Sequence, residues 1–96
     1  MTLVLGHFEA IRKARHQAEV ARPAVTDEEF WFNDYTDDMI AIIRDQSFMT
    51  VGGFWTFPLT HEDRELIVAY LLRCREAEED DRAERLQKFK AQQLAA

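Results

Sequence analysis

The sequence predicts a single, mainly α-helical domain with a minor β component, and three observations support this fold class. Apolar residues recur at helical spacing over most of the 96 positions. Few glycines and prolines interrupt the chain, and Pro23, Gly52-Gly53 and Pro58 divide it into four segments. An apolar share of 47% with 31% charged residues is ordinary globular composition. A chain of this length can bury a core without disulfides.

The first segment predicts an N-terminal helix that ends near Arg22, because a residue before proline is disfavoured in the α region. Its apolar residues share one helical face; they are Val4, Phe8, Ile11, Ala14, Ala18 and Ala21. The side chains on this face become smaller along the helix, from large residues near its start to alanines near its end. We therefore expect another backbone to approach its C-terminal half closely, either within the fold or across a dimer interface.

The second segment predicts two short helices that meet near residues 33–35. Thr26 and Glu29 match a capping box at the first start, and Thr36 is placed to cap the second. Two hydrophobic staples accompany these starts; they pair Val25 with Phe30 and Tyr35 with Ile40. The β-branched run at residues 39–43 also fits a strand. The two caps favour the helix.

The third segment, residues 48–57, predicts a β-hairpin with Gly52-Gly53 as its two-residue turn. In that register Val51 pairs with Phe54, and both faces of the ribbon are apolar. A two-stranded ribbon needs cover, so we expect helices on one face and a second subunit or partner on the other. Trp55 and Phe57 are the candidate oligomer contacts. A loop between two extended segments is the alternative.

The fourth segment predicts a helix from about His61 to about Gln92, about 48 Å long at 1.5 Å per residue. Thr60 and Asp63 cap its start. Its apolar stripe ends at Ala77. This predicts a compact α-rich domain over 1–77 and a charged helical extension over 78–96, held by acid–base pairs four residues apart. The extension is either a frayed tail or a docking arm; its candidate contacts are Leu86 and Phe89.

Residues 27–38 concentrate six carboxylates and four aromatic side chains without a basic residue. We call this segment the acidic block. Residues 26–45 carry a net charge of −6, equal to that of the whole chain. Helix N-termini favour acids, and the aromatics can form core, so local stability explains part of the pattern. Three consecutive aromatics nevertheless fan across about 200° of a helix, so at least one is expected to face outward. The candidate contacts for a basic protein partner are Glu28, Trp31, Asp34, Asp37 and Asp38.

Other kinds of chemistry have little support in the sequence. The three histidines lack paired metal-ligand spacing, and no nucleotide-binding or hydrolase motif occurs. We therefore expect no metal, no cofactor and no enzymatic activity. The net negative charge argues against direct nucleic-acid binding, and no apolar run is long enough to span a membrane. Cys74 is the only cysteine, which rules out an intrachain disulfide. A reducing cytoplasm is the expected compartment.

In length, charge, aromatic content and lack of catalytic motifs the chain resembles many phage and mobile-element accessory proteins, including anti-CRISPR and other host-inhibitory proteins. The resemblance covers composition and no motif. It implies a stoichiometric inhibitor or adaptor that presents the acidic block to a basic groove, as a nucleic-acid mimic does. The alternatives are a structural or assembly subunit that oligomerises through the hairpin and long helix, and a small enzyme or metal protein. We expect the protein to be a homodimer, because the apolar hairpin and the alanine-lined first helix exceed what one small domain covers easily.

Overall fold

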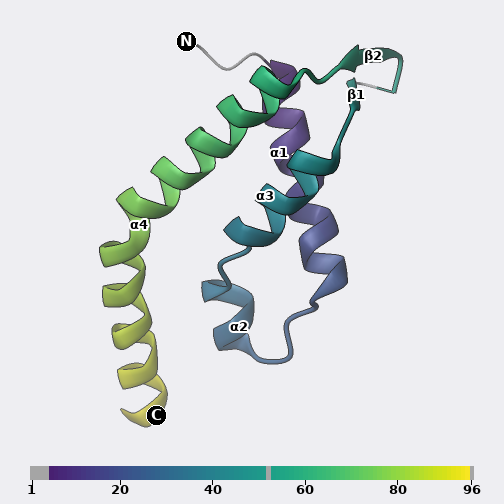
Figure 1. Cartoon of the computed structure of the whole chain (residues 1–96). Coiled ribbons are helices and arrows are strands. Elements are labelled where there is room, and N and C mark those ends of the chain that lie inside the picture. The colour runs from purple at the N-terminus through teal and green to yellow at the C-terminus, as the bar shows by residue number, and fades with distance from the viewer. Residues whose placement is uncertain (1–4, 52, 96) are drawn as a thin grey trace.

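The computed structural model describes residues 5–51 and 53–95, with the backbone alone at Met49, Val51 and Trp55. These residues form four helices and two strands (Figure 1); in chain order they are α1 (Leu5–Ala21), α2 (Asp27–Phe32), α3 (Thr36–Asp45), β1 (Phe48–Val51), β2 (Trp55–Pro58) and α4 (His61–Ala95). The predicted class, mainly α with minor β and a long C-terminal helix, is confirmed. The run at residues 39–43 is helical, as its caps favoured.

The core lies where α1, α3 and the first half of α4 meet. Ala10, Ala14 and Ala18 are buried on α1, and their small side chains allow α3 to pack closely. The close approach expected of the alanine stripe therefore occurs within the fold. The predicted stripe was partly wrong, because Phe8 and Ala21 are exposed. The core otherwise consists of buried residues from the α2–α3 loop, α3, the β2–α4 loop and α4; they are Tyr35, Met39, Ile40, Ile43, Leu59, Ile67, Val68 and Leu71.

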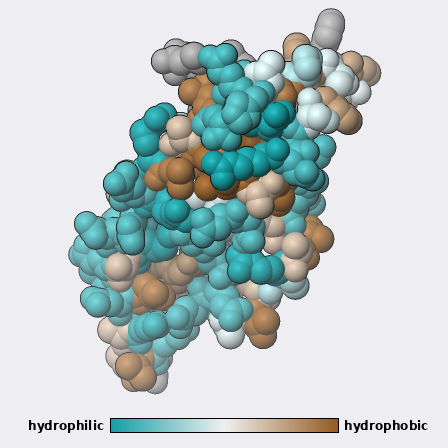
Figure 2. All heavy atoms as spheres, in the orientation of Figure 1, coloured by the Kyte–Doolittle hydropathy of each residue, from teal (hydrophilic) through white to brown (hydrophobic). Residues whose placement is uncertain are grey.

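Helix α4 determines the shape of the molecule. Its 35 residues span about 52 Å at 1.5 Å per residue, and the molecule measures 51 × 26 × 20 Å. The helix curves, so that its first half lies beside α1 and α3 and its second half lies beside α2 (Figure 1). Hydrophobic atoms gather in the upper part of the face shown in Figure 2, whereas the lower part, over α2 and the end of α4, is mostly hydrophilic.

The helix starts follow the predicted caps in two cases out of three. The Thr60 hydroxyl accepts the Asp63 N–H at 3.0 Å, and the Asp63 carboxylate accepts the Thr60 N–H at 3.1 Å, which completes the box at α4. The Thr26 hydroxyl accepts the Glu29 N–H at 3.1 Å. The Glu29 carboxylate, however, accepts the N–H of Val25 instead of Thr26. Val25 is 87% exposed, so the staple predicted there buries little surface.

The prediction that Thr36 caps α3 is wrong. Thr36 is the first residue of the helix, and its hydroxyl and N–H both donate to a carboxylate oxygen of Asp34, at 2.5 and 2.9 Å. An aspartate that accepts from the backbone two residues later forms an Asx turn. This arrangement lets Thr36 lie buried, and it gives Asp34 the capping role.

Strands β1 and β2 pair antiparallel, one residue out of the predicted register. Val51 faces Trp55 and Thr50 faces Thr56, so three residues separate the paired ends where two were predicted. The hydroxyl oxygens of Thr50 and Thr56 lie 3.4 Å apart. One face of the pair is therefore partly polar, which corrects the expectation of two apolar faces. The Trp55 side chain, a predicted oligomer contact, lies outside the described residues.

The packing of α1 against α3 predicts the effect of enlarging Ala14. Ala14→Leu adds three carbons where the side chain has no exposed surface, and overpacking of this kind lowers the free energy of unfolding by about 1–3 kcal/mol. Ala21→Leu, at an exposed position of the same helix, is the control and is expected to change it by less than about 0.5 kcal/mol. Urea unfolding curves measure both. Equal stability of the two variants would contradict the close α1–α3 packing.

Candidate functional site

Four of the six carboxylates of the acidic block are paired with basic residues of other parts of the chain. Helix α4 supplies three of these partners, in the ion pairs Glu28–Lys90 (3.4 Å), Asp34–Arg82 (3.2 Å) and Asp37–Arg75 (3.0 Å). Asp38 pairs with Arg22 at the end of α1. Each of the four carboxylates predicted to contact a partner therefore has an internal partner already.

The basic residues of α4 are spaced to match the acidic block. Arg75, Arg82 and Lys90 are seven and eight residues apart, close to two turns of a helix, so they lie along one side of it. A further ion pair lies near the start of α4, with the charges exchanged: the base, Arg44, is on α3, and the acid, Glu65, is on α4, at 3.3 Å. A ladder of ion pairs thus follows α4 along the length that faces α3 and α2.

Asp34 is the most constrained carboxylate of the block. Partial burial acts to raise its pKa, but the two hydrogen bonds from Thr36 and the nearby Arg82 guanidinium outweigh this, and the pKa lies below its ordinary value. The side chains of Asp34 and Arg82 are 33% and 24% exposed. Asp34 therefore caps α3 and fixes α4 at the same time.

Because most carboxylates of the acidic block are paired, the unpaired negative charge lies partly elsewhere in the molecule. Within the described part of the chain, no ion pair involves Asp27 at the start of α2, nor Glu76, Glu79 and Asp80 on α4. Asp37 stays exposed although it is paired, and the hydrogen bond that Arg75 donates to its carboxylate raises the pKa of Arg75. The negative field is therefore spread between the tip of α2 and the middle of α4.

The aromatic residues of the block divide between surface and core, as the helical fan predicts. Phe30 and Trp31 are 64% and 68% exposed, and their rings meet edge to face with centroids 5.1 Å apart. We call these two residues the aromatic patch. Phe32 is half-buried against Phe89 of α4, and Tyr35 lies in the core.

The aromatic patch borders a surface groove of about 480 Å³ between the end of α1 and α2; its lining residues are Arg15, Glu19, Pro23, Ala24, Phe30, Trp31 and Tyr35. Tyr35 lines this groove, and two hydrogen bonds hold its side chain in place. Its hydroxyl donates to the Arg22 carbonyl at 3.3 Å and accepts from the Asn33 amide at 2.9 Å. The guanidinium carbons of Arg15 and Arg22 lie 5.3 and 5.5 Å from the centre of the Tyr35 ring. A groove with aromatic and apolar walls suits a side chain or short segment of a partner protein.

A second cavity, of about 220 Å³, lies where α1, α3 and α4 meet. Its arginines, such as Arg82, are already bound to carboxylates. Cys74 is half-buried on its wall, and a hydrogen bond with the Cys74 side chain raises the pKa of Tyr70. Among the described residues, no hydrogen bond joins Cys74 or Tyr70 to a histidine that would activate it as a nucleophile.

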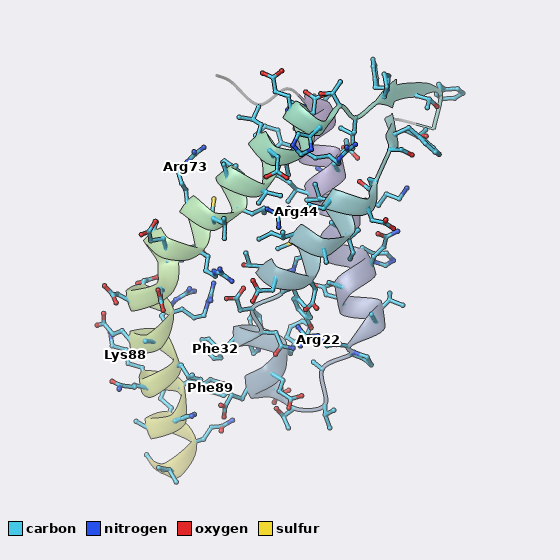
Figure 3. All side chains as sticks on the ribbon, in the orientation of Figure 1. Arg22, Phe32, Arg44, Arg73, Lys88 and Phe89 are labelled. Carbon is cyan, nitrogen blue, oxygen red and sulfur yellow. The ribbon has the colours of Figure 1, made fainter. Side chains whose placement is uncertain are left out.

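The predicted docking residues of α4 face inward. Leu86 is half-buried, and the Phe89 ring lies 5.3 Å from that of Phe32 (Figure 3). Phe57 in β2 is 48% exposed. Sequence reasoning missed Phe32 and the basic partners of the block. The regular seven- and eight-residue spacing of bases on α4 was the signal that could have identified those partners.

Among residues 5–51 and 53–95, no three His, Cys, Asp or Glu side chains gather as a metal ion would require, and none of the helices is both long and apolar enough to cross a membrane. No protein-family model, no curated protein and no solved structure matches the chain.

The role of Asp34 predicts a pH-dependent loss of stability. Its pKa is lower in the folded chain than the ordinary 3.8, so its stabilisation is present above that pH and is lost as the pH falls through the folded pKa. Asp34→Ala removes the cap and should lower the free energy of unfolding by about 1 kcal/mol at pH 7. The difference from wild type should shrink as the pH falls below 3.8 and through the lowered pKa of the folded chain. Asp80→Ala is the exposed control, and urea titrations from pH 2 to 7 measure both. A difference that does not vary with pH would contradict this role.

Proposed function

We propose that the chain is a protein-binding module, acting as a stoichiometric inhibitor or adaptor, whose contact surface is the aromatic patch and the groove beside it. The observation that carries this proposal is the exposure of two large neighbouring aromatics on one short helix. Phe30 and Trp31 are 64% and 68% exposed while the same helix has no buried residue. Such side chains contribute little to the stability of this fold.

Exposed aromatic residues are the usual anchors of protein interfaces. Tryptophan and tyrosine are enriched among the residues that dominate binding energy, because a rigid ring buries a large area at a low entropic cost. Trp31 can insert into a partner while the groove receives a side chain in return. The rings are already held edge to face, so little ordering is needed on binding.

The charge of the chain favours a partner with a basic surface. Asp27 lies beside the patch, and the chain carries a net charge of −6. Exposed acids at the rim of an interface accelerate encounter with a basic partner and contribute less to the final affinity. Asp38 is 40% exposed and pairs with Arg22, whose guanidinium lies over the Tyr35 ring of the groove, so it belongs to this rim. The aromatic patch thus supplies affinity, and the acids supply steering.

A second candidate function is an assembly subunit that forms homodimers through the strand pair. Its support is the exposure of three phenylalanines around β1 and β2; they are Phe48 at 59%, Phe54 at 90% and Phe57 at 48%. Light scattering over a range of concentrations distinguishes this candidate. A dimer that Phe54→Ser dissociates would support it, and a species of 11.3 kDa at every concentration would exclude it.

The aromatic patch predicts that Trp31→Ala weakens partner binding at least about 30-fold, as truncation of a dominant interface residue does. Because Trp31 is largely exposed, the thermal melt should be unchanged. Leu94→Ala, which removes an exposed apolar side chain at the end of α4, is the matched control and should bind as wild type does. The measurement is calorimetry with the protein captured from native cells by crosslinking. Equal affinity of Trp31→Ala and wild type would refute the patch as the contact surface.

A further inference from the structure

Helix α2 and the second half of α4 hold each other in place. Among the described helices and strands, α2 contacts α4 alone, and it has no buried residue of its own. The buried residues of α4, Ile67, Val68 and Leu71, all lie in its first half, against the core. The second half of α4 therefore has α2 and the loop after it as its packing surface.

The contact has an aromatic centre with an ion pair on either side. The rings of Phe32 and Phe89 point toward each other from α2 and α4 (Figure 3), with centroids 5.3 Å apart. Lys90 binds Glu28 at 3.4 Å, and Arg82 binds Asp34 at 3.2 Å. The side chains of Glu28 and Lys90 are 40% and 52% exposed, so solvent and salt screen this pair.

We infer that residues 82–90 of α4 form a displaceable strap over a docking surface made by Glu28, Phe32 and Asp34, and that this surface accepts a basic helix with an aromatic residue. The inference rests on the proposed function, since it adds the inner side of α2 to the outer patch. The strap shows which chemistry the docking surface accepts. Arg82 and Lys90 bind the carboxylates of Asp34 and Glu28, and the Phe89 ring packs against that of Phe32.

The strap can open without disturbing the core. Its contacts lie beyond the last buried residue of α4, Leu71, and segments with few buried contacts are the first to open locally. A partner helix of the same charge pattern replaces each contact that it breaks. While the strap of the same chain occupies the docking surface, the Phe32 and Phe89 rings cover each other until such a partner is present.

A synthetic peptide of residues 82–95, which carries the strap, tests this inference on the full-length chain. Arg82→Glu with Lys90→Glu should open the strap by placing acids against Glu28 and Asp34. We expect this variant to bind the peptide at least tenfold more tightly than wild type, whose own strap competes at a high effective concentration. Fluorescence anisotropy of the labelled peptide measures the affinity.

The matched control is Arg85→Glu with Lys88→Glu, which changes the charge of the strap equally. Arg85 and Lys88 pair with Asp81 and Glu84 of the same helix, and Lys88 points away from α2 (Figure 3). This control should bind the peptide as weakly as wild type does. Equal peptide affinity of the two double variants would overturn the inference.

A second variant guards against misfolding of the first. If Arg82→Glu with Lys90→Glu loses its cooperative melt, Phe89→Ala replaces it and is also expected to bind the peptide more tightly than wild type; affinity equal to wild type would overturn the inference. The assay requires no native partner and leaves Phe30 and Trp31 intact. Failure of the strap and failure of the aromatic patch are therefore separate results.

Discussion

The pairing of the acidic block with the basic side of α4 is the interaction on which the arrangement of α2 and the second half of α4 depends. It orients α2, which has no buried residue and no other helix or strand to pack against in the described chain. The two ion pairs at Glu28 and Asp34 contribute about 0.2–1 kcal/mol each, and the Phe32–Phe89 ring pair about 0.5–1.5 kcal/mol. The sum, about 0.9–3.5 kcal/mol, is small beside the 5–15 kcal/mol of a typical domain. This end of the molecule is therefore held in place, but weakly.

The same pairing changes which residues of the acidic block are available to a partner. Carboxylates that look from the sequence like a concentrated negative field are mostly engaged by Arg22 and the bases of α4. The aromatic residues next to them gain importance, because Phe30 and Trp31 remain exposed without a structural role. A partner would meet aromatic rings first, with acids at the rim and a second acidic surface beneath the strap.

Local signals in the sequence predicted local structure well. The Thr60–Asp63 box, the Thr26 cap and the glycine- and proline-free fourth segment were enough to predict the short helix starts and the long α4. The register of β1 and β2 was predicted one residue away from its observed position, because the Gly52-Gly53 pair is compatible with a turn of either two or three residues. The cap of α3 was assigned to Thr36, since the sequence alone does not show that the hydroxyl of this residue turns inward to Asp34.

The candidate site was less predictable than the fold. Glu28 and Lys90 are 62 positions apart in the sequence, and no periodicity or motif links residues so distant. Acids in the first turns of α2 and α3 have a sufficient local explanation in the helix dipole, which concealed their second role. Composition suggested a surface of free negative charge, whereas the curvature of α4 brings positive charge onto it.

Hydrogen exchange of single amides, followed by NMR at low and high salt, tests the central claim most directly. If ion pairs hold α2 and the end of α4 together, amides such as those of Phe30 and Asn33, which donate to Thr26 and Glu29, should exchange faster in salt. The amides around Lys90 should follow them. Those around Ile43 in the core should stay protected. Exchange in α2 and the strap that does not change with salt would contradict the account.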